Sequence, residues 1–310
     1  MERQVTVFGG TGFIGRHVIR RLVKRGLRVI VAARDPGRAL FLKSMGDVGQ
    51  IAPVACNYDR DEDITAAMRG SEVAVNLIGM LFGRGRQNFQ ALHVDFPRRL
   101  ARIAAARGVR RMAHISALGA DAASLAHYAR SKAAGEQAVQ AEFPRAVLLR
   151  PSVVFGPGDD FLNRFAAMAK YLPCLPLIGG GHTKFQPVYV GDVADAVVAA
   201  LDMPEAAGRI YELGGPAIYS FRELLDYIMR ATGRRRCLLN LPWGLAKFQA
   251  RLLQYLPRPP LTPDQVELLK QDNIVSPGAL TLTDLGISPT AMEVIAPTYL
   301  DRFRAGGRFG

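Results

Sequence analysis

Three residues of this chain could carry proton-transfer chemistry: Ser116, Tyr128 and Lys132. Tyr128 and Lys132 lie four residues apart, so on a helix they share one face. We expect the Lys132 ammonium to favour the phenolate and to lower the pKa of Tyr128 from about 10 toward neutrality. Ser116 would hold a carbonyl group or orient the tyrosine. Such a set can give a proton to a carbonyl as a hydride arrives, although a Tyr-x-x-x-Lys pattern alone is also typical of a solvated helix face.

A glycine-rich turn near the start of the chain predicts what would supply that hydride. A short apolar run, Val5–Phe8, reads as a buried strand, and Gly9, Gly12 and Gly15 follow before a helical pattern. Strand, glycine turn and helix together predict a dinucleotide site, with the diphosphate at the helix N-terminus. Lys132 could also hold the ribose next to the nicotinamide. We expect further contacts from the turn, from the helix start and from the end of the fourth strand: Thr11, Phe13, Ile14, Arg16, Leu77, Ile78 and Gly79.

The end of the second predicted strand indicates which dinucleotide is bound. Arg34 stands where a carboxylate would read the ribose 2′-hydroxyl of NAD, and an arginine there accommodates a 2′-phosphate. The sequence therefore favours NADPH. Asp35 fits a helix cap before Pro36 better than a ribose contact. Asn57, after the third strand, could hydrogen-bond the adenine or satisfy its own loop, and the sequence leaves both alternatives open.

The elements that would position these residues alternate along the first half of the chain. The predicted strands are Val5–Phe8, Arg28–Ala33, Gln50–Cys56, Val73–Ile78, Arg111–Ser116 and Ala146–Leu149, and the predicted helices are Phe13–Arg25, Pro36–Gly46, Asp61–Arg69, Asn88–Arg107 and Ala126–Ala141. This alternation predicts an α/β fold, a Rossmann-type doubly wound parallel sheet in residues 1–150. The pattern degrades after Pro151, so residues 151–310 are expected to form a smaller mixed domain that closes the cleft.

That second half contains three more helical patterns, Val193–Asp202, Phe221–Ala231 and Trp243–Tyr255, and a helix start with Thr262 as cap and Pro263 in the first position. The carboxyl-terminal third of the whole chain interleaves arginines and lysines with aromatic residues. We expect it to offer a basic and aromatic docking surface that suits a headgroup layer, a protein groove or RNA. An amphipathic helix packed on its own domain is the ordinary alternative.

Charge is the unusual bulk property of the sequence. Lysine and arginine total 40 against 27 acidic residues, a formal net charge of +13, which favours an anionic partner. Solubility alone could also explain this excess. The first strand begins almost at Met1, so we expect no signal peptide, and no apolar run is long enough to span a membrane. We also expect three reduced thiols at Cys56, Cys174 and Cys237, and no metal site among the scattered histidines.

The motifs resemble those of the extended, atypical short-chain dehydrogenase/reductases between about Val5 and Leu213. The likeness depends on the glycine turn, on Ser116 and the Tyr128/Lys132 pair, and on the segments Arg150-Pro151-Ser152 and Val188–Ala194. It implies that Pro151, Ser152 and Val153 contact the nicotinamide end of the cofactor. One departure is His93 in the stretch His93-Val94-Asp95-Phe96-Pro97, where many of these enzymes carry asparagine. That departure puts substrate turnover in doubt.

A narrower resemblance is to the nucleotide-binding accessory subunits of respiratory complex I, of the alpha-subcomplex subunit nine type, here in a bacterial form. It depends on His114–Ala120, on Tyr128–Glu136, on Asn76–Gly79 and on Leu268–Asn273. The resemblance implies tightly held NADPH, other complex I subunits as partners, and a peripheral place at the cytoplasmic face of the bacterial inner membrane. An anionic membrane surface is a further expected partner, and no DNA partner is expected.

Two other functions stay open at this stage. The chain could be a free NADPH-dependent reductase or epimerase that acts on a carbonyl or quinone-related compound. Its charge would also suit an RNA-binding member of the same fold, which the motifs favour less. Two arginines in the loop Leu81–Arg86 are expected over the nicotinamide, where they could meet an anionic partner or lie in solvent.

Overall fold

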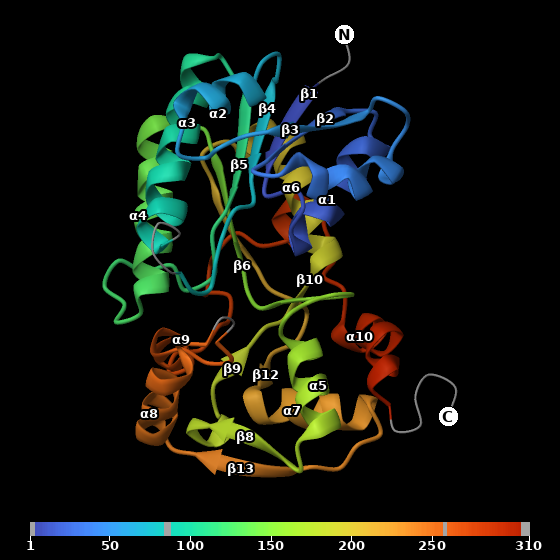
Figure 1. Cartoon of the computed structure of the whole chain (residues 1–310), viewed down its shortest axis with the longest axis vertical. Coiled ribbons are helices and arrows are strands. Elements are labelled where there is room, and N and C mark those ends of the chain that lie inside the picture. The colour runs from blue at the N-terminus through green and yellow to red at the C-terminus, as the bar shows by residue number, and fades with distance from the viewer. Residues whose placement is uncertain (1–3, 84–87, 257–258, 305–310) are drawn as a thin grey trace. The chain divides into compact units, whose positions relative to one another are not determined.

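The computed structural model describes residues 4–83, 88–256 and 259–304, which fall into two compact units (Figure 1). The first comprises Met1–Pro151, Gly191–Glu212 and Ala279–Ile287, and the second comprises Ser152–Val190, Leu213–Gly278 and Ser288–Gly310. This division differs from the expected split after residue 150, because two later segments return to the first unit. The predicted loop arginines, Arg84 and Arg86, lie outside the described residues.

A seven-stranded parallel sheet organises the first unit. Its strand order is β11-β6-β5-β4-β1-β2-β3, so the chain crosses from one half of the sheet to the other between β3 and β4. The central strand β1 pairs with β2 and β4, with Val7 opposite Val31 and Val75. A parallel sheet of this order carries ligands beyond the carboxyl ends of its central strands. The strand bounds are β1 Gln4–Phe8, β2 Arg28–Ala33, β3 Ile51–Ala55, β4 Val73–Asn76, β5 Arg111–Ile115, β6 Val147–Pro151 and β11 Ile210–Leu213.

Helices cover both faces of this sheet, as the doubly wound prediction requires. Figure 1 shows α2 (Asp61–Ala67), α3 (Phe96–Ala106) and α4 (His127–Glu142) on one face, and α1 (Phe13–Lys24) and α6 (Val190–Asp202) on the other. Arg21 of α1 joins Asp195 of α6 at 2.9 Å. Two predicted helices differ in type. Pro36–Met45 is a 3-10 helix, η1, and α3 is preceded by a π-helix, η2, over Gln90–Asp95.

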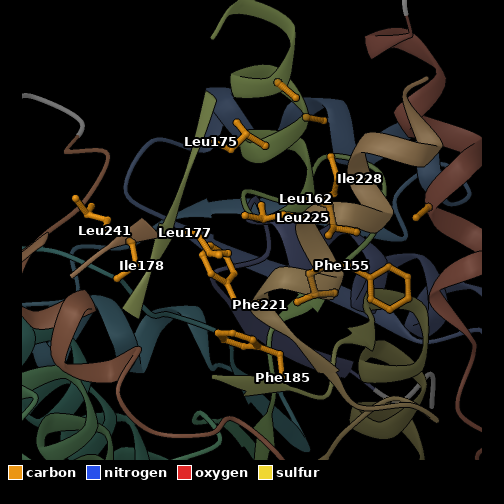
Figure 2. Packing of buried hydrophobic residues seen from close by; sticks show 14 of the residues in the cluster. Phe155, Leu162, Leu175, Leu177, Ile178, Phe185, Phe221, Leu225, Ile228 and Leu241 are labelled. Atoms are coloured by element: carbon orange, nitrogen blue, oxygen red, sulfur yellow. The ribbon is translucent and has the colours of Figure 1, made fainter. Parts of the chain in front are cut away.

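In its described residues, the second unit combines short strand pairs with five α-helices and the 3-10 helices η3 (Gly179–Gly181) and η6 (Asp301–Phe303). Its strands are β7 Val154–Phe155, β8 Cys174–Ile178, β9 Lys184–Phe185, β10 Val188–Tyr189, β12 Tyr219–Ser220 and β13 Cys237–Leu241, and its helices are α5 Leu162–Tyr171, α7 Phe221–Ala231, α8 Trp243–Leu253, α9 Pro263–Leu268 and α10 Met292–Leu300. Figure 2 shows its core, in which Phe155, Phe185 and Phe221 meet leucines of α5, α7 and β8. The predicted Thr262 cap is confirmed: its side chain accepts a hydrogen bond from the Gln265 N–H.

The cysteine prediction is wrong for one pair. Cys174 and Cys237 are opposite each other on the parallel strands β8 and β13, with Cα atoms 4.5 Å apart, and they form a disulfide. The two cysteines are 63 residues apart along the chain, so the sequence alone does not show that they lie opposite each other. Cys56 is free and buried, and burial raises the pKa of its thiol to about 12. Within the described ranges, no helix has the length and apolar character to cross a bilayer.

Candidate functional site

The turn after β1 can be built only with glycine at two positions. Gly9 has φ +82°, and a Cβ there would lie 3.0 Å from the Leu77 carbonyl carbon. A Cβ on Gly15 would lie 2.4 Å from the Gly9 oxygen, so α1 can approach β1 only without a side chain at that position. The Gly12 N–H closes the turn by donating to the Gly9 oxygen at 3.1 Å. The predicted strand–turn–helix geometry is therefore present, with Thr11 and Gly12 exposed at its tip.

The N-terminus of α1 is open to an anion. Gly12 is its N-cap, no side chain caps it, and its first turn holds no acidic residue. The backbone donors of Phe13, Ile14 and Gly15 begin this helix, where the helix dipole favours negative charge. Nearby, the buried Nε of Arg16 has no hydrogen-bond partner among the described residues, and the guanidinium lies 5.6 Å from the Phe13 ring centroid. Open donors and an unpartnered guanidinium fit the diphosphate that the sequence predicts.

The ends of β2 and β3 hold the residues predicted at the adenosine. Arg34 follows β2 and is exposed, and Asp35 accepts a hydrogen bond from the Gly37 N–H at 3.0 Å, so the preferred reading of Asp35 as a helix cap is confirmed. Asn57 makes the loop contact, with its Oδ1 accepting from the Asp59 N–H at 3.1 Å. Its role at the adenine stays a prediction.

Buried polar contacts fix the ends of β4 and β5. Asn76 Nδ2 lies 3.0 Å from His114 Nδ1, and Asn76 Oδ1 accepts from the Ile78 N–H at 3.1 Å. This second contact ends β4 two residues before the predicted Ile78. It also orients the backbone of Leu77–Gly79, which was predicted to pass beside the cofactor.

Lys132 lies near the other two predicted catalytic residues, Ser116 and Tyr128. Its ammonium donates to the Ile115 carbonyl, at the residue before Ser116, over 3.3 Å, and it lies 5.9 Å from the Tyr128 ring centroid. A Cβ on Gly79 would come 3.3 Å from the same Nζ. Ser116 is 3% exposed, and its Oγ has no hydrogen-bond partner among the described residues. The structure thus brings β5, α4 and the loop after β4 together around one ammonium and one unpartnered hydroxyl.

The expected pKa shift of Tyr128 is wrong in direction. Burial raises the pKa of Tyr128 to about 12, and burial lowers the pKa of Lys132 to about 8 against the opposing charge of Glu136. Burial removes the Tyr128 phenolate from water, which destabilises it. The Lys132 ammonium, 5.9 Å from the ring centroid, stabilises the phenolate by a smaller amount. At neutral pH, Tyr128 is therefore a neutral phenol, which can donate a proton but is not a ready base.

His93 is part of this site, and the sequence analysis recorded it only as a departure from the family pattern. Its Nε2 accepts from the Met80 N–H at 3.1 Å, which leaves the proton on Nδ1, 2.8 Å from Ser131 Oγ. The imidazole ring meets the Tyr128 ring edge to face, with 5.5 Å between the ring centroids. Burial, with a smaller effect of Lys132, lowers the pKa of His93 to about 2, so the imidazole stays neutral. The π-helix η2 places this ring, and no sequence signal predicts a π-helix there.

The residues predicted at the nicotinamide end fall on both sides of the division between the units. Pro151 ends β6 in the first unit, whereas Ser152 and Val153 belong to the second. Ser152 Oγ donates to Asn273 Oδ1 at 2.7 Å, and the Val153 N–H donates to the same oxygen at 3.2 Å. Asn273 thereby fixes the chain after β6, and the nicotinamide contact stays a prediction. The described residues contain no group of three or more histidine, cysteine or acidic side chains that could hold a metal.

Comparison with known proteins decides the family. The model of the NAD dependent epimerase/dehydratase family matches residues 5–214, which include the glycine turn, Ser116, Tyr128 and Lys132. The chain belongs to this family. The same architecture occurs in the crystal structure of UDP-glucuronic acid 4-epimerase from Bacillus cereus in complex with UDP-glucuronic acid and NAD. That structure has a TM-score of 0.67 and 18% identity, covering 96% of this chain and 99% of that one.

Two relatives have sequence identities to this chain of 30% or more. The mitochondrial NADH dehydrogenase (ubiquinone) 1 alpha subcomplex subunit 9 of Arabidopsis thaliana is 38% identical over 314 residues, which cover 97% of this chain and 78% of that protein. The ceramide reductase of Caulobacter vibrioides is 30% identical over 241 residues, which cover 77% of this chain and 73% of that protein. The first match extends over both units of the chain.

Proposed function

We propose that this protein is an NADPH-binding accessory subunit of respiratory complex I, with a structural role in the peripheral arm near the membrane. The observation that carries the proposal is the extent of the similarity to the alpha subcomplex subunit 9, 38% identity over 97% of the chain. The family model, in contrast, ends at residue 214. The additional matched length includes Asn273, which holds Ser152 and Val153. The subunit would be peripheral, at the cytoplasmic face of a bacterial inner membrane.

The residues of the first unit fit NADPH. The open N-terminus of α1 and Arg16 would hold the diphosphate, and Arg34 would hold the 2′-phosphate. Lys132 would hold the ribose next to the nicotinamide. Ser116, whose Oγ has no hydrogen-bond partner among the described residues, would hold the amide group of the nicotinamide. When bound, NADPH can supply a hydride. Tyr128, as a neutral phenol, has the proton that a reduced carbonyl would need.

That complete proton-donor set supports a second candidate function, a free NADPH-dependent reductase acting on a carbonyl compound. The 30% identity to a ceramide reductase over 77% of the chain is the observation that favours it. We rank it second because this match covers less of the chain than the subunit match does.

Co-purification separates the two functions. The chain, tagged in its native host, should migrate with NADH:ubiquinone oxidoreductase activity when mild detergent extracts of the membranes are fractionated by size. Its denatured extract should release NADPH in about equimolar amount. Migration apart from that activity, together with carbonyl-dependent NADPH oxidation that is lost in Tyr128→Phe, would instead establish the reductase.

A binding titration tests the choice of cofactor. Arg34→Ala should weaken NADPH binding by about 10- to 100-fold and change NADH binding little, because only NADPH carries the 2′-phosphate. Arg28→Ala is the matched control, since Arg28 is also exposed but begins β2, at the end of the strand opposite Arg34. Equal losses for both cofactors in Arg34→Ala would remove the 2′-phosphate assignment.

A further inference from the structure

Helix α8 of the second unit has an apolar face that no described residue covers. The helix buries Ala246 and Ala250 in the core shared with Val266 of α9. Its other side exposes Leu245 by 48%, Phe248 by 59% and Leu252 by 62%, and Tyr255 and Leu256 continue that side just beyond the helix. Leu245, Phe248 and Leu252 follow helical spacing on one face, and Tyr255 and Leu256 follow the end of the helix. Contiguous apolar surface of this kind marks an interaction site.

Strand β13, which leads into α8, also exposes an apolar side chain. Leu239 of this strand is 62% exposed, whereas Leu241 points into the core (Figure 2). The opposite end of the strand lies beside the end of α5, because Arg236 Nε donates to the Ala169 carbonyl at 2.8 Å. There Tyr171 is 76% exposed and Leu172 is 42% exposed. Apolar side chains are thus exposed at both ends of β13, over about 16 Å of strand.

A basic hollow adjoins the start of β13. Its volume is about 490 Å³, and four arginines and one aspartate are among its lining residues, which are Asp226, Met229, Arg230, Gly233, Arg234, Arg235 and Arg236. Arg234 and Arg236 are held by backbone carbonyls, those of Phe303 and Ala169. The exposed guanidinium groups of Arg230 and Arg235 make no hydrogen bond or ion pair with a described residue. The hollow therefore presents two uncommitted cations on a fixed frame.

The charge of this surface is predominantly positive: Asp226 is the one acidic residue in the described lining of the hollow, and on α8 Lys247 pairs with Glu267 at 2.7 Å. Residues 243–256 contain Lys247 and Arg251 and no acidic residue. A complementary partner must be apolar along α8 and anionic beside the hollow. A bilayer with anionic lipids offers both, since its acyl boundary takes leucine and aromatic side chains and its headgroups attract arginine. Tyr255, with an apolar ring and a polar hydroxyl, suits that boundary.

We propose that the α8 surface, defined as the exposed face of α8 and Tyr255–Leu256, Leu239 and the arginine hollow, binds an anionic phospholipid bilayer. In this arrangement α8 lies in the headgroup layer with Phe248 and Leu252 directed toward the acyl chains. The arginines contact lipid phosphates. This inference goes beyond the proposed nucleotide and subunit roles, and its test uses the isolated chain, so either proposal can fail without the other.

Vesicle sedimentation tests this surface. The purified full chain should bind vesicles of phosphatidylcholine with phosphatidylglycerol more tightly than vesicles of phosphatidylcholine alone, and added salt should weaken the binding. The double variant Phe248→Glu/Leu252→Glu should lower the partition coefficient about tenfold or more. Val294→Glu on α10, where the side chain is also 64% exposed, is the matched control and should bind like the wild type.

The arginine hollow is tested separately. Arg230→Gln/Arg235→Gln should lose about fivefold per arginine on anionic vesicles and nothing on neutral ones. Circular dichroism and thermal melting establish that each variant is folded. Wild-type protein that stays off both vesicle types would overturn the proposal, as would a Phe248→Glu/Leu252→Glu variant that binds like wild type. If the wild type ignores lipid but that variant fails to assemble with complex I, the face docks on protein instead.

Discussion

The helices α1 and α7 begin in opposite ways. At α7, Ser220 Oγ accepts from the Glu223 N–H at 3.2 Å, and the Glu223 carboxylate accepts from the Ser220 N–H at 2.7 Å, a complete capping box. At α1, the cap is Gly12, which offers no side-chain oxygen. The N-terminus of α7 is completed by its own residues, whereas α1 leaves its donors open. A missing side-chain cap does not by itself mark a ligand site, since α5 and α10 of the second unit also lack one. At α1 the glycine turn before the open N-terminus is the feature that indicates a ligand.

The same contrast extends to buried side-chain atoms. Arg16 Nε and Ser116 Oγ, both without a hydrogen-bond partner among the described residues, lie at the predicted cofactor site of the first unit. In the second unit, Ser152 and Asn273 satisfy each other. Tyr227 OH is an exception, a buried unpartnered hydroxyl of the second unit that nothing in the structure explains. Unsatisfied polar atoms are costly when buried, so their concentration near Gly12 and Ser116 is consistent with a bound polar ligand.

Substituting Gly12 would test this contrast most strongly. Gly12→Asp should give α1 its own cap and a negative charge, so NADPH affinity should fall about 100-fold or more, while the free energy of unfolding changes by less than about 0.5 kcal/mol because the new Cβ would lie 3.2 Å from the Gly9 oxygen and offset the cap. Titration calorimetry and chemical denaturation measure the two effects. Gly12→Asn is the matched control, because it can cap without the charge and should lose less affinity. Unchanged NADPH binding in Gly12→Asp would mean that the diphosphate lies elsewhere.

The first unit was predictable because its signals are local. The β-branched run of β1 and the glycines after it specify a strand, a turn and a helix, and the structure contains all three within one residue of the predicted bounds. Asp35 and Thr262 were predicted as caps for the same reason, since a cap depends on its next three residues. Features that depend on residues close together in the sequence, such as turns and helix caps, can therefore be predicted from it.

The features that escaped prediction depend on contacts distant along the chain. β11 has only four residues, and its partner β6 lies about 60 residues earlier, so no local pattern marks it. The Cys174–Cys237 pair depends on the register of β8 and β13. The pKa of Tyr128 depends on how much of the surrounding chain excludes water, which outweighs the lysine that the spacing identified. The apolar face of α8 likewise became visible only once burial was known.

His93 is a polar group of the first unit that is satisfied internally, so its loss should affect stability. His93→Asn should lower the free energy of unfolding at pH 7 by about 1–3 kcal/mol, because the Met80 N–H and Ser131 Oγ lose their partner. The pKa of His93 is lowered to about 2 in the folded chain, against about 6.5 when unfolded, so the unfolded state binds the extra proton. Wild-type stability therefore falls as the pH drops below 6.5.

The deficit of His93→Asn should consequently shrink by about 1 kcal/mol between pH 7 and pH 5.5, as urea denaturation at the two pH values would measure. His182→Asn, which removes an exposed imidazole, is the control and should leave the difference from wild type the same at both pH values. A deficit for His93→Asn that stays constant with pH would show that the imidazole is accessible to protons in the folded chain.

The smallest expected effect comes from the capped helix of the second unit. Ser220→Ala removes the oxygen that accepts from the Glu223 N–H, so it should lower the free energy of unfolding by about 1 kcal/mol. NADPH affinity should not change, because the capping box completes its own helix and belongs to the unit without the glycine turn. Ser220→Thr, which keeps the hydroxyl that contacts the Glu223 carboxylate at 2.8 Å, should retain the stability of the wild type. If Ser220→Ala instead weakened NADPH binding as Gly12→Asp is expected to do, the capping box of α7 would not be purely structural.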